Sequence, residues 1–192
     1  MIGHRLATVA AVHACAPRPR TTKTVLESLF AEGPSTERRE ARQRPKDKRV
    51  SASLLSTKDT FIAEVQAEMI RRDPDRSHTW VMVTDAERAL QRRIGATFSG
   101  VTLVLDLLHV LEKLWKVGHA LYGEGSPEAV VFVRERARRV LDGEVSQVVK
   151  GLRLIATKRR LTGEKAKALK SVADYLDANQ TRMAYDDYIA KG

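Results

Sequence analysis

The sequence has little of several residue types, and each scarcity excludes a class of protein. Among 192 residues there is one cysteine, Cys15, and only 5% are aromatic. One cysteine forms no internal disulfide and supplies no zinc-finger ligand set, which is typical of a reducing, cytoplasmic location. Few aromatic residues, with much Leu, Val, Ala, Arg, Lys and Glu, favour helices over a β-sandwich. Because free cysteines are usually buried, Cys15 is predicted to be a core residue.

Long apolar runs are also missing. The longest run, 101–110, already contains Asp106 and His109, whereas a membrane-spanning helix needs about 18 or more apolar residues. We therefore expect no membrane partner. The first twenty residues weakly resemble a signal peptide. The interpretation that we adopt instead is a buried strand over 5–14, ended by Pro17.

Positive charge is what the sequence has in excess. Its 34 Lys and Arg residues outnumber 24 Asp and Glu residues, so the net charge is +10, which predicts an anionic partner. Between Arg134 and Lys170 there are 12 basic and 4 acidic residues. A basic helical surface is typical of contact with the phosphate backbone, and the alternative is an ordinary solvated helix face. The scarcity of aromatic residues favours double-stranded DNA over single strands. The residues predicted to bind it are Arg134, Arg138, Arg139, Lys150, Arg153, Lys158, Arg159 and Arg160.

Hydrophobic periodicity predicts an α/β fold class, with a sheet in the N-terminal half followed by an α-helical region. We expect two domains, 1–106 and 107–192, of which the second is a basic helical region. The expected elements are a strand over 5–14, a helix over 22–31, an exposed basic loop over 35–50, a strand over 50–54, a helix from a capping box at 56–59 to 73, a strand over 78–84, a helix over 86–94, a strand over 101–105, and helices from 107, 126, 145 and 164 and over 180–190.

Two acids follow strands in this pattern. Asp85 ends the strand over 78–84, and Asp106 ends the strand over 101–105. A right-handed crossover makes these strands parallel and puts both acids at one sheet edge. Asp85 is a candidate Mg²⁺ ligand, or else a helix cap. Asp106 and His109, three residues apart, either flank a metal or phosphate site or are a cap beside a surface histidine. No phosphate-binding glycine loop, zinc-protease motif or serine-nucleophile motif is present.

Several segments together resemble a known family over nearly the whole chain. They are Ala16 to Thr21, Trp80 to Gln91, Val104 to Trp115, Val133 to Arg136 and Ala173 to Leu176. In these segments the sequence resembles bacterial insertion-sequence transposases of the Kra type. The resemblance implies an RNase H-like fold of the DDE superfamily, in which three acids hold two Mg²⁺ or Mn²⁺ ions for DNA cleavage and joining.

On this resemblance, Asp85 matches the second acid, the catalytic and metal-binding residue. Asp106 and His109 match the family's Asp-x-x-His-Val-Leu-Glu segment. Ala86 stands where the family usually has glycine. The first and last acids have no match between Met1 and Gly192, so the resemblance implies an internal fragment that does not stably hold the metals and does not cleave DNA alone.

Two further functions compete with this interpretation. One is a non-enzymatic, basic DNA-binding regulator derived from a transposase, which binds element ends or co-assembles with the intact enzyme. The other is a helical interaction module without a nucleic-acid partner. Salt-dependent binding to duplex DNA separates the first from the second.

Overall fold

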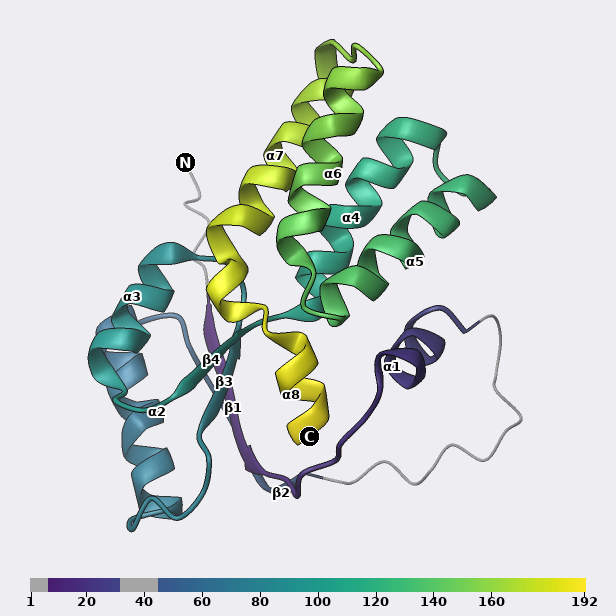
Figure 1. The fold of residues 1–192 in the computed structure, drawn as a ribbon. Helices are drawn as coiled ribbons and strands as arrows, with labels where there is room; N and C mark the ends of the chain where they lie inside the picture. The colour runs from purple at the N-terminus through teal and green to yellow at the C-terminus, as the bar shows by residue number, and fades with distance from the viewer. Residues whose placement is uncertain (1–6, 32–44) are drawn as a thin grey trace. The chain divides into compact units, whose positions relative to one another are not determined.

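The computed structural model describes residues 7–31 and 45–192, which form two compact units (Figure 1). The mixed α/β class is as expected. Of the described residues, the first unit holds 7–16 and 45–103, and the second holds 17–31 and 104–192. Residues 17–31 thus fold with the second unit, although the sequence analysis grouped them with the N-terminal domain.

An antiparallel ribbon opens the first unit. Strand β1 (Thr8–Ala14) pairs with β2 (Lys46–Ser53), with Ala11 opposite Val50, and the register is irregular between Val12 and Ala14. Along β1 the residues alternate between half-buried and exposed, so the expectation of a buried strand was wrong. The second strand begins at Lys46, within the expected basic loop 35–50, because pairing with β1 overrides its polar composition. Positions 35–44 of that loop lie outside the described residues.

Cys15 is exposed, so its predicted place in the core was wrong. The half-buried face of β1 carries Thr8, Ala10 and Val12, while His13 lies on the exposed face. Because the strand ends at Ala14, Cys15 falls beyond the ladder and gains no cover from it.

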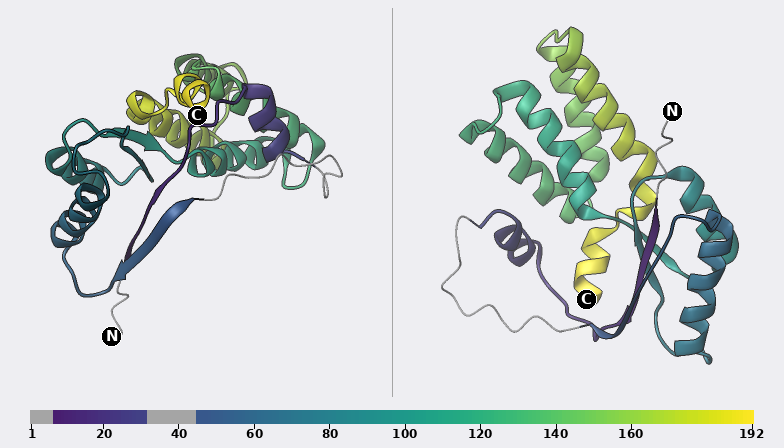
Figure 2. Two further views of the ribbon diagram at one scale, coloured as in Figure 1. Left: turned by 90° about the horizontal axis from the view of Figure 1, so that it is seen from below. Right: turned by 180° about the vertical axis from the view of Figure 1, so that it is seen from behind.

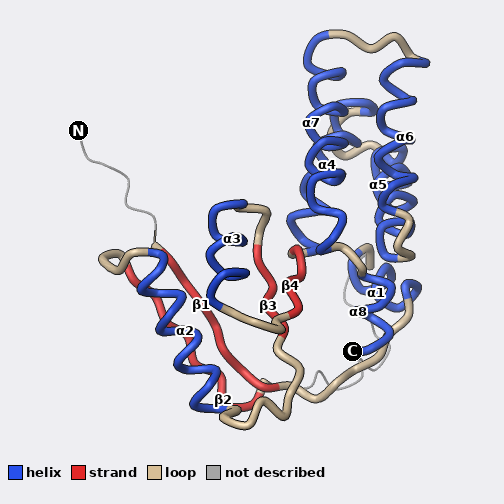
Figure 3. The backbone as a smooth tube through the Cα atoms, turned by 60° about the vertical axis from the view of Figure 1, so that its left-hand side comes forward, coloured by secondary structure: helices blue, strands red, loops and turns tan. Residues whose placement is uncertain are grey.

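Helix α2 (Lys58–Arg72) packs against β1, and Figure 3 shows it running along the ribbon. It begins where the sequence predicts a cap, since the side chain of Thr57 accepts the N–H of Thr60 at 3.2 Å. It ends at Asp73, as the Asp-Pro pair indicates.

The first unit continues with β3 (Val81–Thr84) and α3 (Arg88–Thr97), and β4 (Thr102–Leu105) crosses the boundary between the units after residue 103. Strands β3 and β4 form a second two-stranded sheet. The N–H of Thr102 donates to the carbonyl of Trp80 at 2.9 Å, which joins the starting ends of the two strands, as expected of a parallel pair. The four described strands thus form two separate sheets, so a single RNase H-like sheet stays a prediction.

Four buried side chains form the core of this unit: Ile62, Trp80, Ile94 and Phe98. The rings of Trp80 and Phe98 meet edge to face at 6.4 Å. These residues come from α2, α3 and the segments flanking β3 and β4. The core therefore lies at the starting ends of the two strands, where Trp80 precedes β3.

A buried carboxylate holds the turn between α2 and β3. Asp73 accepts the indole N–H of Trp80 at 2.8 Å, the N–H of Ser77 at 2.9 Å and the N–H of His78 at 3.1 Å. Hydrogen bonds from His78, Trp80 and Ser77 hold the pKa of Asp73 well below its usual range. The sequence analysis assigned Asp73 only the end of a helix.

The second unit is helical. Its elements are α1 (Thr22–Leu29), α4 (Leu107–Tyr122), α5 (Pro127–Leu141), α6 (Val145–Lys158), α7 (Gly163–Asn179), a 3-10 turn (Gln180–Arg182) and α8 (Tyr185–Lys191). Figures 1 and 2 show α4, α5, α6 and α7 side by side; α4 packs on α5 and α7, and α6 packs on α7. None of the helices among the described residues is long and apolar enough to span a membrane.

Apolar side chains at helical spacing fill the centre of this unit. Leu114, Leu152, Leu169 and Leu176 are almost completely buried. At Gly118, an added Cβ would lie 3.0 Å from Cγ2 of Val133, so glycine permits the close approach of α4 and α5. The periodicity that predicted these helices also identified their buried faces.

Candidate functional site

Asp85 is exposed and directly follows β3. Its Oδ1 accepts the N–H of Glu87 at 3.0 Å, and its carbonyl accepts the side-chain amide of the buried Gln91 at 2.7 Å. The N-cap of α3 is Glu87, so Asp85 precedes the helix start and is not its cap residue. These bonds hold the backbone of Asp85, and Oδ2 accepts no hydrogen bond from any residue that the structure describes.

Asp106 is the N-cap of α4, where its Oδ1 accepts the N–H of Leu108 at 2.9 Å. Its Oδ2 lies 3.1 Å from Nδ1 of His109, and both side chains are partly exposed. The local geometry is therefore that of a helix cap with a neighbouring histidine. The backbone ahead of it is anchored within the same unit, because the buried hydroxyl of Tyr185 donates to the carbonyl of Leu105 at 2.7 Å. A role for Asp106 and His109 beside a catalytic site stays a prediction.

A metal centre needs several ligands in one place. Across residues 7–31 and 45–192, no group of three or more His, Cys, Asp or Glu side chains is placed to hold a metal ion. Asp85 supplies one carboxylate, whereas two divalent cations need several carboxylates around them.

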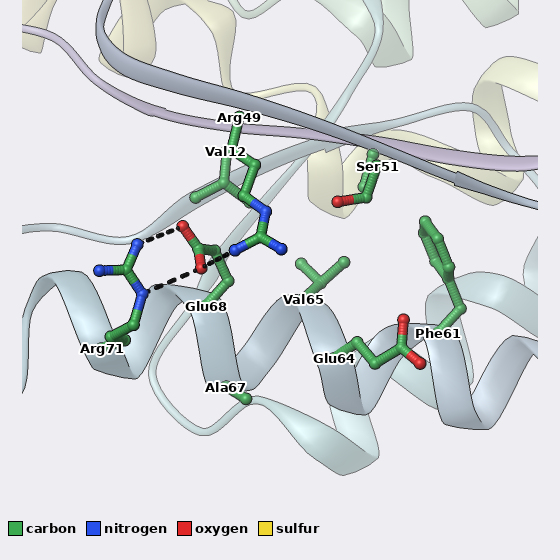
Figure 4. A pocket seen from close by; sticks show the side chains of 10 residues that line it. Val12, Arg49, Ser51, Phe61, Glu64, Val65, Ala67, Glu68 and Arg71 are labelled. Atoms are coloured by element: carbon green, nitrogen blue, oxygen red, sulfur yellow. Dashed lines mark hydrogen bonds and ion pairs between the residues drawn. The ribbon is translucent and has the colours of Figure 1, made fainter.

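The first unit contains a hollow of about 360 Å³ between the ribbon and α2 (Figure 4). Glu68 lies beside it and is only 10% exposed. Its carboxylate accepts hydrogen bonds from Arg49 at 3.0 Å, Arg71 at 2.8 Å and Arg72 at 2.6 Å. The hydrogen bonds from Arg71 and Arg72 lower the pKa of Glu68 to about 2. Since Arg49 belongs to β2, this cluster ties the ribbon to the helix.

This cluster predicts an acid-sensitive first unit. The pKa of Glu68 is about 2 in the folded chain against an ordinary 4.5, so its stabilisation is complete above pH 4.5 and is lost as the pH falls toward 2. We expect Glu68→Gln to lower the urea midpoint at pH 7 and to reduce the difference between pH 7 and pH 2.5. The measurement is tryptophan fluorescence in a Trp115→Phe background, so that Trp80 alone reports.

Glu64→Gln is the matched control for this prediction. Glu64 lines the same hollow, one turn before Glu68, and forms no ion pair with any described residue. Its variant should keep the urea midpoint of the parent chain at both pH values. Equal pH dependence in Glu68→Gln and the parent chain would show that the arginine cluster does not stabilise the first unit.

The residues predicted to bind DNA are distributed over α5, α6 and the turn after α6. Three of them already pair with carboxylates. Arg138 and Arg139 both bind Glu135, and Arg153 binds Asp174 and Asp177 on α7 at 3.2 and 3.0 Å. Counting charges only between 134 and 170 missed those two acids, because the packing of α6 on α7 brings them opposite Arg153. The basic surface is partly neutralised.

Five of the predicted DNA-binding residues form no ion pair with any residue of the described segments: Arg134, Lys150, Lys158, Arg159 and Arg160. Lys158 ends α6 and Arg160 follows it in a tight turn. There the N–H of Leu161 donates to the carbonyl of Ala156, and that of Arg160 to Thr157, each at 3.0 Å. Arg160 has a φ of 48°, a left-handed conformation that helix ends usually give to glycine.

Replacing Arg160 by glycine is therefore expected to raise stability and weaken DNA binding. Relief of the left-handed strain, less the backbone entropy of glycine, should stabilise the second unit by about 0.5–1 kcal/mol. Urea unfolding followed by circular dichroism measures the gain, and anisotropy of a labelled duplex measures the loss. Arg159→Gly is the control, because Arg159 has a φ of −84° and glycine there relieves no strain. A lower urea midpoint for Arg160→Gly would contradict the prediction.

Comparison with protein-family models, with curated proteins and with solved structures gave no match. The functional argument therefore depends on the residues of this chain.

One basic residue of functional interest was absent from the predicted DNA-binding set. Arg136 on α5 is half-buried, and its guanidinium lies 3.6 Å from the ring centroid of Phe132. The signal was available, since Phe132 and Arg136 are four residues apart and lie on one face of the helix. The charge count treated Arg136 as one cation among twelve and did not consider the aromatic ring four residues before it.

Proposed function

We propose that this chain is part of a DDE-type transposase with an RNase H-like fold, and that it supplies Asp85 as one of three metal-holding acids. The observation that carries the proposal is the position of Asp85 directly after β3, exposed, with Oδ2 unbonded among the described residues. The amide of the buried Gln91 donates to its carbonyl, and the half-buried Met82 of β3 packs against the core of the unit. A fixed carboxylate at a strand end suits a metal ligand.

The order of elements supports the same proposal. An antiparallel ribbon is followed by a helix, a strand that ends at Asp85, a second helix and a strand that pairs with the first. This order is compatible with part of an RNase H-like sheet. In the intact family the reaction is DNA transposition by metal-dependent phosphoryl transfer, in which Mg²⁺ or Mn²⁺ would stabilise the attacking and leaving oxygens.

The proposed partner is double-stranded DNA, bound through the second unit. Its support is the group of predicted cations that form no ion pair with a described carboxylate, Arg134, Lys150, Lys158, Arg159 and Arg160, on a chain with a net charge of +10. Contacts of this kind release counterions, so affinity should fall linearly with salt on a double logarithmic scale.

The test of the catalytic part is a nicking assay with the purified chain. We expect no cleavage of supercoiled or linear element DNA in Mg²⁺ or Mn²⁺, because a single matched acid does not fix two cations about 3.5–4 Å apart. DNA binding should persist in the same samples. Nicking that is present in the parent chain and absent in Asp85→Ala would overturn the prediction that this chain alone is inactive.

A second candidate function is a non-enzymatic regulator that binds element ends or co-assembles with an intact transposase. The unpaired cations of the second unit favour it, since they need no metal-holding acid. The two functions differ in what flanks the coding region. In-frame or frameshifted codons for an upstream strand ending in Asp and a downstream Glu-containing helix support the transposase, and their absence supports the regulator.

A further inference from the structure

Two arginines and two aromatic rings meet where α4, α5 and α6 come together in the second unit. The guanidinium carbon of Arg136 lies 3.6 Å from the ring centroid of Phe132. The guanidinium carbon of Arg159 lies 5.6 Å from the ring centroid of Tyr122, and the ring centroids of Tyr122 and Phe132 are 5.6 Å apart. Each ring thus holds one cation, and the charge of Arg159 acts on Arg136.

Neither guanidinium has a carboxylate partner among the described residues. Arg136 donates to the carbonyl of Phe132 at 3.3 Å, and Arg159 donates to the hydroxyl of Tyr122 at 3.3 Å. Each bond uses one N–H group, and a guanidinium has five. Most donors of this pair therefore remain for a ligand. This distinguishes the pair from Arg138, whose guanidinium binds two acids.

The electrostatics of the pair favour an anion. Burial is the main cause that lowers the pKa of Arg136; Tyr122 and Glu135 oppose it, and the nearby charges of Arg139 and Arg159 lower it by less. Arginine nevertheless stays charged at neutral pH. Arg136 is half-buried, whereas Arg159 is exposed. A charge that is partly removed from water beside a second like charge is costly, and a bound anion offsets that cost. The ring of Phe132 and the hydroxyl of Tyr122 also hold the two guanidiniums in place before a ligand arrives.

We propose that Arg136 and Arg159, held by Phe132 and Tyr122, clamp one phosphodiester group of duplex DNA. The proposal rests on the DNA partner proposed above and names a contact within it. Two guanidinium groups and the hydroxyl of Tyr122, whose oxygen accepts from Arg159 and whose hydrogen remains to donate, match the several acceptor oxygens of a phosphate. A polyanion is favoured over a free phosphate because Lys158 and Arg160, on either side of Arg159, offer contacts for neighbouring phosphates.

The experiment compares Arg136→Gln, Arg159→Gln and the double variant of the full chain, with a labelled 20-base-pair duplex. Each single variant should lose affinity by roughly tenfold or more, as expected for charged hydrogen bonds. Because both arginines contact the same phosphate, the double variant should reduce the salt slope by about 0.9, the value for one phosphate, and not by about 1.8. Arg153→Gln removes one charge from an arginine that already binds two acids, and should weaken binding less than either of the other single variants.

Two further variants separate contact from folding. Arg136→Lys keeps the charge and the stem but lacks the planar fork, so it should fold as the parent chain does and still bind less tightly. Tyr122→Phe keeps the ring and removes the hydroxyl, and should weaken binding less than either glutamine variant. Circular dichroism and urea midpoints establish that each variant is folded.

The outcomes distinguish the clamp from the broader function. If the parent chain binds the duplex and both glutamine variants bind equally well, the clamp is wrong and the proposed function stands. If the parent chain binds no duplex, both the proposed DNA partner and the proposed clamp for its phosphate are wrong. Side-chain Nε–H resonances of Arg136 and Arg159 that shift with inorganic phosphate, but not with duplex, would assign the pair to a free phosphate and overturn the proposal.

Discussion

Leu152→Ala is expected to lower the free energy of unfolding of the second unit by about 2–5 kcal/mol, whereas Leu154→Ala should change it by about 0.5 kcal/mol or less. Both residues lie on α6, but Leu152 is 1% exposed and Leu154 is 51% exposed. The first substitution removes apolar contacts and leaves a cavity among packed helices. The second removes atoms that already contact water.

Urea unfolding followed by the helical circular dichroism signal measures this difference. The two variants delete the same atoms two positions apart, so helix propensity changes equally in both. Equal effects would mean that the buried face of α6 is assigned wrongly. The assignment of Lys150 and Arg153 to the exposed face would then be wrong as well, and the argument for a basic surface would fail.

Helix positions were predictable because their signals are local. Ser126 caps α5 by accepting the N–H of Ala129 at 3.2 Å, and Pro127 starts the helix, as the sequence alone indicated. The start of α4 after Asp106 was likewise predicted from the acid and the apolar stripe that follows it. Such features depend on residues within one or two turns of each other.

The strands were harder to predict, since a strand depends on a partner distant in the sequence. The first half of β2 reads as a charged loop, and only pairing with β1 makes it a strand. Cys15 was misplaced for the same reason: alternation along a strand does not show where the ladder ends. Local composition contains neither fact.

Asp85 shows the intermediate case. The sequence placed it correctly at the end of a strand, but local spacing did not distinguish a ligand from a helix cap. The structure gives the cap position to Glu87 and leaves Asp85 exposed two residues earlier. No local pattern identifies the remaining acids of a catalytic site, because such acids come together only through tertiary structure.

The charge pattern needed tertiary structure most of all. Twelve basic residues in a stretch of sequence suggest one continuous surface, but Glu135, Asp174 and Asp177 neutralise three of the arginines predicted to bind DNA. Ion pairs across α6 and α7 form between residues more than twenty positions apart. The sequence therefore overestimates the number of cations that remain for a partner.

This distinction leads to the second large expected effect, on DNA binding. Replacing Lys150, Lys158 and Arg160 together by glutamine should reduce the salt slope of duplex binding by about 2.7, at about 0.9 for each lost phosphate contact. A matched variant replaces Arg138, Arg139 and Arg153 by glutamine. Its affinity at low salt should exceed that of the first variant by several orders of magnitude, because these guanidiniums already bind carboxylates.

Both triple variants lower the net charge by three, so the long-range attraction of DNA falls by the same amount in each. Any difference between them reports direct contact with phosphate. Titrations of a labelled duplex between about 50 and 200 mM salt, the range over which such contacts weaken strongly, give both slopes. Identical slopes would show that only overall charge attracts DNA, in which case the unpaired cations of the second unit do not form a defined binding surface.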